Sequence, residues 1–149
     1  MAKTHEKNRT AGKPTPTVLS INICDAVIRD ESTKKISLIG IFNTIHVANF
    51  PSVHPLMHLY MALTNGHGQY QGEIRLVDDK GKILIHAEGP LEFKNPLQVV
   101  EINFEWRQLK FEHEGEYVIE VMCDSHQVGI RKFRIVGPKL IHTSGTEAR

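Results

Sequence analysis

Nine histidines are the residues of this 149-residue chain that could most readily bind a metal. His54 and His58 are four residues apart, and His46 precedes them by a short connection. Zinc needs three or four ligands that converge tetrahedrally, and a four-residue spacing provides two of them on a helix. Here the segment enters an extended strand, in which four residues span about 13 Å. His46, His54 and His58 are therefore weak metal candidates, and we expect solvated or locally hydrogen-bonded side chains.

Catalytic chemistry has little support elsewhere in the sequence. Cys123 is close in sequence to His126, but it continues an apolar strand face, which predicts an inert core thiol. The DDKG stretch at 78–81 satisfies a turn better than a calcium loop. No nucleophile elbow, phosphate-binding glycine loop or dinucleotide fingerprint occurs. We predict no cofactor and no enzymatic activity; a histidine-based metalloprotein or enzyme is a third-ranked hypothesis.

Two features could bind a ligand or a partner instead. Tyr60 shares the polar face of a predicted strand with His58, and an exposed ring there could stack on a small polar ligand such as a sugar. Residues 48–56 contain two prolines, which remove backbone donors, so we expect a stiff connection outside the middle of any sheet. Its apolar residues could plug the open end of the core or contact a partner. The candidate contacts are Phe50, Pro51, Val53, His54 and Pro55.

The elements that must position these residues are strands. Apolar and polar residues alternate along several stretches, most clearly along 100–107, and no stretch has a helical stripe. The predicted strands are 17–25, 35–47 (one long strand bent near Gly40), 57–64, 69–78, 82–88, 98–107, 116–123 and 128–136. The fold class is all-β: a single antiparallel β-sandwich of about eight strands, immunoglobulin-like in architecture.

Tyr117 follows a long loop at the start of a predicted strand, in the sequence Gly115-Glu116-Tyr117. Immunoglobulin-like sandwiches often have a corner tyrosine in such a position. The next cysteine, however, is six residues further on rather than two. The sequence leaves open whether Tyr117 is a corner tyrosine or an ordinary core aromatic.

Charge and composition suggest a single domain with two tails. We predict a disordered basic arm at 1–16, a sandwich domain at 17–136 and a flexible C-terminal tail at 137–149. The arm has a net charge of +3 and the C-terminal tail one of +1, so the total of +1 leaves a mildly acidic body of net charge −3, which is unsuited to nucleic acid. No secretory signal or membrane span is evident, so we expect a cytoplasmic protein with Cys24 and Cys123 as buried free thiols.

Several segments in order resemble a known family. They are KISLIGIFNTI at 35–45, FPSVHP at 50–55, GEIRLVDDKG at 72–81 and EGEYVIEVMCD at 114–124, after an opening Cys24-Asp25. Together they are similar to an uncharacterised bacterial family of small all-β proteins, classed as a domain of unknown function. The resemblance spans residues 18–136 and implies the fold, but it provides no catalytic residues.

The leading functional hypothesis is a non-enzymatic interaction module. Exposed edge strands invite strand addition, so we expect it to bind a protein partner or form a homodimer through a sheet edge or the 48–56 loop. The alternative is a domain that binds a small polar ligand at Tyr60 and His58.

Overall fold

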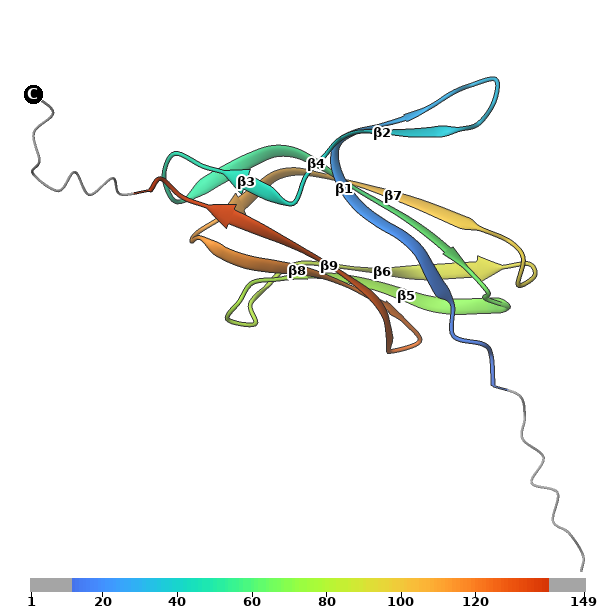
Figure 1. Ribbon diagram of the computed structural model, residues 1–149. Helices are drawn as coiled ribbons and strands as arrows, with labels where there is room; N and C mark the ends of the chain where they lie inside the picture. The colour runs from blue at the N-terminus through green and yellow to red at the C-terminus, as the bar shows by residue number, and fades with distance from the viewer. Residues whose placement is uncertain (1–11, 140–149) are drawn as a thin grey trace, which may run out of the picture.

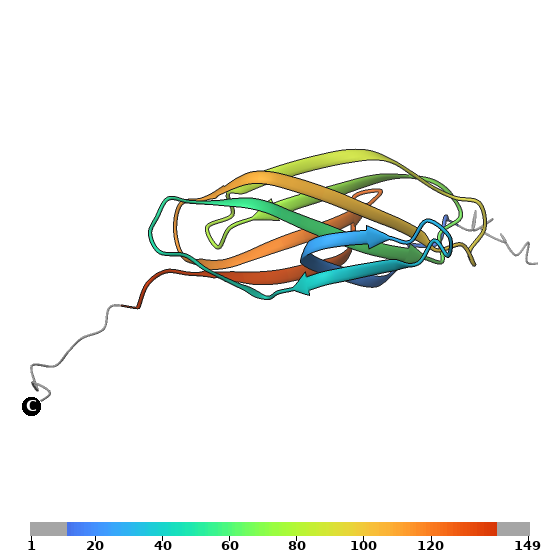
Figure 2. The ribbon, with the colours of Figure 1, turned by 90° about the horizontal axis from the view of Figure 1, so that it is seen from above.

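The computed structural model describes residues 12–139, which form two packed β-sheets (Figures 1 and 2). One sheet has the strand order β2-β1-β4-β7, and the other has the order β3-β9-β8-β5-β6. The strands are β1 (Thr17–Arg29), β2 (Ile36–Ile41), β3 (Thr44–His46), β4 (Ser52–Thr64), β5 (Gly68–Val77), β6 (Ile83–Phe93), β7 (Val100–Phe111), β8 (Gly115–Cys123) and β9 (His126–Val136). None of these residues forms a helix that could span a membrane. The all-β, immunoglobulin-like sandwich predicted from the sequence is confirmed.

The described residues form nine strands instead of the predicted eight because the predicted strand 35–47 divides between the two sheets. β2 pairs antiparallel with β1, whereas β3 pairs parallel with β9. The expected bend is present at Gly40, which has a φ of 69°. A Cβ at this position would lie 2.3 Å from a carboxylate oxygen of Asp25, so only glycine fits here without a shift.

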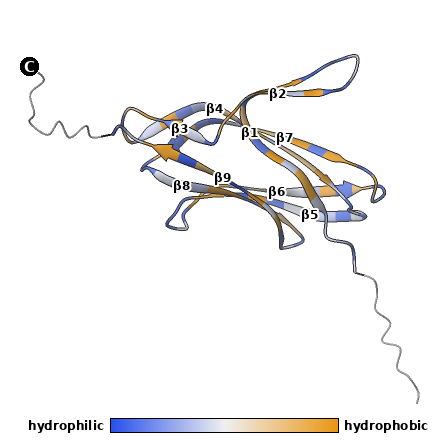
Figure 3. Cartoon of the chain, in the orientation of Figure 1, coloured by the Kyte–Doolittle hydropathy of each residue, from blue (hydrophilic) through white to orange (hydrophobic). Residues whose placement is uncertain are grey.

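The inner faces of the two sheets form one apolar core, and hydrophobic and hydrophilic residues alternate along strands such as β7 (Figure 3). Phe111 and Phe133 pack around Tyr117, with ring centroids 5.0 and 5.7 Å from the tyrosine ring. The Tyr117 hydroxyl donates a hydrogen bond of 2.6 Å to the backbone carbonyl of His113, four residues upstream. Tyr117 is therefore a corner tyrosine as well as a core aromatic.

The prediction that all of 48–56 is a connection was wrong in its second half. β4 begins at Ser52 and continues through Pro55, pairing with β7. A proline is accommodated because β1 pairs with β4 only between His58 and Thr64. At Pro55 the strand has a neighbour on one side alone, and a strand position with an open side is one that tolerates proline.

The predicted hairpin between residues 69–78 and 82–88 is confirmed as β5–β6, and β6 extends it to Phe93. Residues 1–11 of the predicted arm and 140–149 of the predicted tail lie outside the described residues. Near the end of the arm, Lys13 forms an ion pair with Asp124 at 3.2 Å. The carbonyl of Pro14 accepts a hydrogen bond of 2.6 Å from the Tyr70 hydroxyl. These contacts fasten residues 13 and 14 to the start of β5 and to the β8–β9 turn.

Removing the corner hydroxyl should destabilise the sandwich. We expect Tyr117→Phe to lower the free energy of unfolding by about 1–2 kcal/mol, because a partly buried carbonyl loses its donor while the aromatic packing is kept. Tyr60→Phe is the matched control, since it also removes one hydroxyl, on the outer face of a sheet. Urea denaturation followed by tryptophan fluorescence measures both. Equal losses in the two variants would contradict a special role for the corner.

Candidate functional site

The three weak metal candidates do not converge. Residues 12–139 contain no group of three or more histidine, cysteine or carboxylate side chains that could hold a metal. The His54 ring lies 6.0 Å from the Phe42 ring, and its buried Nε2 has no hydrogen-bond partner in the described structure. His58 Nδ1 lies 3.2 Å from Asn103 Oδ1 on β7. His46 is in β3, in the opposite sheet.

Tyr60 and His58 lie side by side on the outer face of β4, but their polar atoms contact β7. The Tyr60 hydroxyl donates a 2.5 Å hydrogen bond to Glu101. Partial burial and this hydrogen bond raise the pKa of Tyr60 to about 12. A polar ligand at this position would have to compete with Glu101 and Asn103 for the same groups.

The five candidate contacts around residue 50 do not form one surface. Phe50 packs against the core, and a ring carbon of Phe50 would lie 2.7 Å from a Cβ added at Gly137. This packing is expected of a residue that plugs the end of the sandwich. Pro51, Val53 and Pro55 are exposed, and Val53 has an exposed fraction of 49%.

The two cysteines are buried free thiols, as predicted. Burial raises the pKa of Cys123 to about 11, and the charge of Asp124 acts in the same direction. The thiol is therefore protonated at neutral pH and behaves as a small apolar side chain.

A histidine–aspartate cluster that the sequence analysis missed holds the β5–β6 turn. His113 Nε2 lies 3.1 Å from an oxygen of Asp79 and 3.8 Å from one of Asp78. Asp78 accepts hydrogen bonds of 2.9 and 2.8 Å from the backbone N–H groups of Lys80 and Lys82. Burial would raise the pKa of Asp78, but these two bonds and the nearby His113 and Lys80 charges lower it overall. The hydrogen bonds that the Asp78 carboxylate accepts are therefore those of the tight turn predicted for the DDKG stretch.

Three of the nine exposed large hydrophobic side chains of residues 12–139 lie in the β1–β2 hairpin, defined here as residues 25–41. The hairpin leaves the sandwich as a two-stranded ribbon that projects beyond β4 and β7 (Figure 1). Ile28, Ile39 and Ile41 have exposed fractions of 50, 49 and 53%. An isolated two-stranded ribbon is marginally stable in water, and this one exposes isoleucines on an edge strand.

The turn at the tip of the β1–β2 hairpin is held by one carboxylate. Asp30 Oδ1 accepts hydrogen bonds of 3.0 and 2.7 Å from the backbone N–H groups of Ser32 and Thr33. The hydroxyls of the same two residues donate to that oxygen at 2.8 and 2.9 Å. The bonds from Thr33 and Ser32 lower the pKa of Asp30 to about 2. This exposed tip is thus organised by local hydrogen bonds.

The sequence contained a signal for this surface. The stretch ISLIGI at 36–41 is apolar at almost every position, which is typical of a strand buried on both faces. In the structure β2 is at the edge of its sheet, so several of these side chains are exposed instead.

Comparison with known proteins identifies a family but no activity. A family model described as "Family of unknown function (DUF6941)" matches residues 19–136. No curated protein matches the chain.

Solved structures match the chain only at low similarity. An immunoglobulin-like protein of Pseudomonas aeruginosa is 11% identical with a TM-score of 0.44, over 83% of this chain and 98% of that one. CopC of Methylosinus trichosporium OB3b is 15% identical with a TM-score of 0.37, over 84% of this chain and 97% of that one. A Listeria innocua β-glucosidase is 9% identical with a TM-score of 0.41, over 80% of this chain but 16% of that one.

The Asp30 turn makes a pH-dependent prediction. Its pKa is below the unfolded value of about 3.9, so its stabilising effect on the turn is complete above that value. The effect is lost as the pH falls through about 2. We expect the amide resonances of Ser32 and Thr33 to titrate with a midpoint near pH 2 in NMR spectra. Glu31→Gln should leave this midpoint unchanged, and a midpoint near 4 would contradict the hydrogen-bond arrangement.

Proposed function

The chain belongs to this family of unknown function, and we propose that it is a non-enzymatic interaction module that self-associates through the β1–β2 hairpin. The observation that supports the proposal is the combination of half-exposed isoleucines and an edge strand, β2, with no neighbour on its outer side among residues 12–139. Unpaired backbone groups beside apolar side chains favour the addition of another strand.

A comparison of the four sheet edges favours β2 as the contact. β6 contains Pro90 and the exposed carboxylates of Glu88 and Glu92, and β7 carries Glu101 and Glu105; charges and prolines on an edge oppose strand addition. β3 has three residues. β2 contains neither a charge nor a proline over Ile36–Ile41. Among the edge strands of residues 12–139, β2 is therefore the one that is neither very short nor protected by charges or proline.

A second copy of this chain is the partner that the hairpin fits. Two β2 strands that pair antiparallel are related by a two-fold axis, so each copy can cover the isoleucines of the other. The charges of residues 25–41 also balance, with three acidic and three basic side chains, so two hairpins can approach without net repulsion.

The alternatives derived from the sequence have weaker support. Around residue 50, Phe50 is used in packing, so Val53 is the one exposed large hydrophobic side chain there, against three in the hairpin. At Tyr60 and His58 the hydroxyl and the imidazole are paired with β7, which disfavours a polar-ligand site there.

Self-association can be tested with a charge in the proposed contact. We expect the wild type to form a dimer, and Ile39→Lys to weaken it roughly tenfold or more, because a lysine in an apolar contact would be unpaired. Ile130→Lys is the matched control, since Ile130 is 43% exposed but lies on β9 in the other sheet. Light scattering over a range of protein concentrations measures the dissociation constant, and circular dichroism verifies folding.

Three outcomes are informative. Loss of the dimer in Ile39→Lys but not in Ile130→Lys supports the proposal. A wild type that stays monomeric at every concentration overturns self-association. Equal weakening in both variants assigns the effect to surface charge and overturns the hairpin as the contact.

A further inference from the structure

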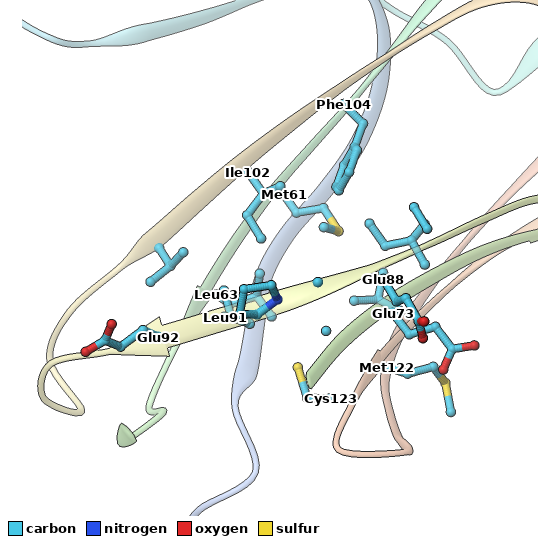
Figure 4. A pocket seen from close by; sticks show the side chains of 17 residues that line it. Met61, Leu63, Glu73, Glu88, Leu91, Glu92, Ile102, Phe104, Met122 and Cys123 are labelled. Atoms are coloured by element: carbon cyan, nitrogen blue, oxygen red, sulfur yellow. The ribbon is translucent and has the colours of Figure 1, made fainter. Parts of the chain in front are cut away.

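An apolar cleft opens between the two sheets on the side where β6 and β7 face each other (Figure 4). β6 and β7 are edge strands of different sheets and do not pair. The cleft has a volume of about 430 Å³, within the range of small-molecule sites. β4 and β7 provide one wall, and β5, β6 and β8 provide the other. The chemistry of these two walls decides which kind of molecule fits.

The wall formed by β5, β6 and β8 has few side chains beside the cleft. Cys123 of β8 pairs with Gly72 of β5, which pairs with Gly89 of β6. These three positions form a row across the inner face, and the two glycines contribute no side chain to it. A Cβ added at Gly89 would meet no atom within 4 Å, so the space beside it is open. The buried Cys123 thiol is protonated and adds no charge.

The opposite wall carries large apolar side chains that face this gap. Met61, Ile102 and Phe104 lie across the cleft from β5 and β6 (Figure 4). Ile102 and Phe104 are only partly buried, whereas Trp106, further along β7, is buried in the filled part of the core. An apolar molecule in the cleft would remove the remaining surface of Ile102 and Phe104 from water, which favours binding.

The charged residues of the lining do not point into the cleft. On β6, Glu88 and Glu92 alternate with inward-facing residues such as the buried Leu91. Both carboxylates therefore leave the strand on the outer face of the sheet. Glu73 leaves β5 on the same outer face, where it is paired with His86 at 2.9 Å. The inward side chains of the lining are thus uncharged, and a charge carried into the cleft would have no partner.

A protein strand is a poor occupant for this side of the sandwich. β6 contains Pro90 and exposed carboxylates, which oppose the addition of a strand at its edge. Residues 1–11 of this chain are mostly polar or charged, so their composition does not match the apolar walls. The size and the apolar lining of the cleft favour a small molecule instead.

We propose that this cleft binds an uncharged, apolar small molecule, which lies between the sheets and contacts Met61, Ile102 and Phe104. The inference goes beyond self-association and does not depend on it, because β2 is at the opposite edge of its sheet from β7. It assigns the missing side chains at Gly72 and Gly89 a role in making space for the ligand.

Two fluorophores that share one aromatic skeleton test the ligand class. N-phenyl-1-naphthylamine is uncharged, and 1-anilinonaphthalene-8-sulfonate carries one negative charge. We expect the uncharged compound to bind the wild type roughly tenfold or more tightly than the sulfonate, because the interior offers the charge no partner. High salt in the titrations screens repulsion by the acidic surface. Equal affinities would contradict selection for an uncharged ligand.

Methyl NMR spectra locate the bound fluorophore. Its aromatic rings should shift the methyl resonances of Met61 and Ile102, which line the cleft. The methyl resonances of Ile28 and Ile39, on the β1–β2 hairpin, should stay unchanged. Shifts on the hairpin alone would assign the binding to exposed isoleucines and overturn the cleft as the site.

Gly89→Leu distinguishes loss of the site from loss of the fold. The new side chain enters open space, and the position before Pro90 favours the extended backbone that leucine also adopts. We expect this variant to bind N-phenyl-1-naphthylamine roughly tenfold or more weakly while its melting temperature stays equal or rises. Gly89→Ala is the control, because one methyl group leaves most of the cleft open and should preserve binding.

Three further results decide the proposal. If the wild type fails to bind the uncharged fluorophore, or if a folded Gly89→Leu variant binds it as well as the wild type does, the cleft is not a ligand site. Ile39→Lys should bind the fluorophore with wild-type affinity, because the hairpin lies outside the cleft. None of these results depends on the oligomeric state, so this proposal and self-association fail separately.

Discussion

Mutual burial of the two inner sheet faces is the constraint on which the rest of this structure depends. Where both faces carry large side chains, as around Tyr117, the layers close into a dense aromatic core. Where one face carries Gly72 and Gly89, the layers cannot meet and an apolar cleft is left. Where β1 and β2 leave the layers, apolar side chains have no cover at all. Exposed or loosely packed apolar surface is thus found where the same packing requirement is incompletely met.

The sequence predicted those features that depend on neighbouring residues. Alternation assigned Ile102 and Phe104 to one face of a strand, and the DDKG stretch at 78–81 placed a tight hairpin turn. The two cysteines followed the apolar pattern of their strands and are buried free thiols. Local backbone chemistry and period-two patterning decide these features, so no knowledge of the partner strands is needed.

Features that depend on which strands are neighbours could not be predicted. Apolar residues at 36–41 are compatible with a central strand or an edge strand, and only the strand order places β2 at an edge. Pro55 is tolerated in β4 because β1 ends its pairing at His58, which the sequence does not show. The cleft requires Gly72 to lie opposite Gly89, and that register is a property of the folded β5–β6 pair.

The composition of the edge strands explains why association is proposed on one side of the sandwich. β2 occupies one edge of its sheet and β7 the other, so an association through β2 leaves the β6–β7 side open to solvent. That side exposes carboxylates on both of its strands and a proline on β6, features that prevent backbone pairing with another chain. The carboxylates and the proline on this side, and the uncharged β2 on the other, therefore assign protein contact to one edge of the sandwich.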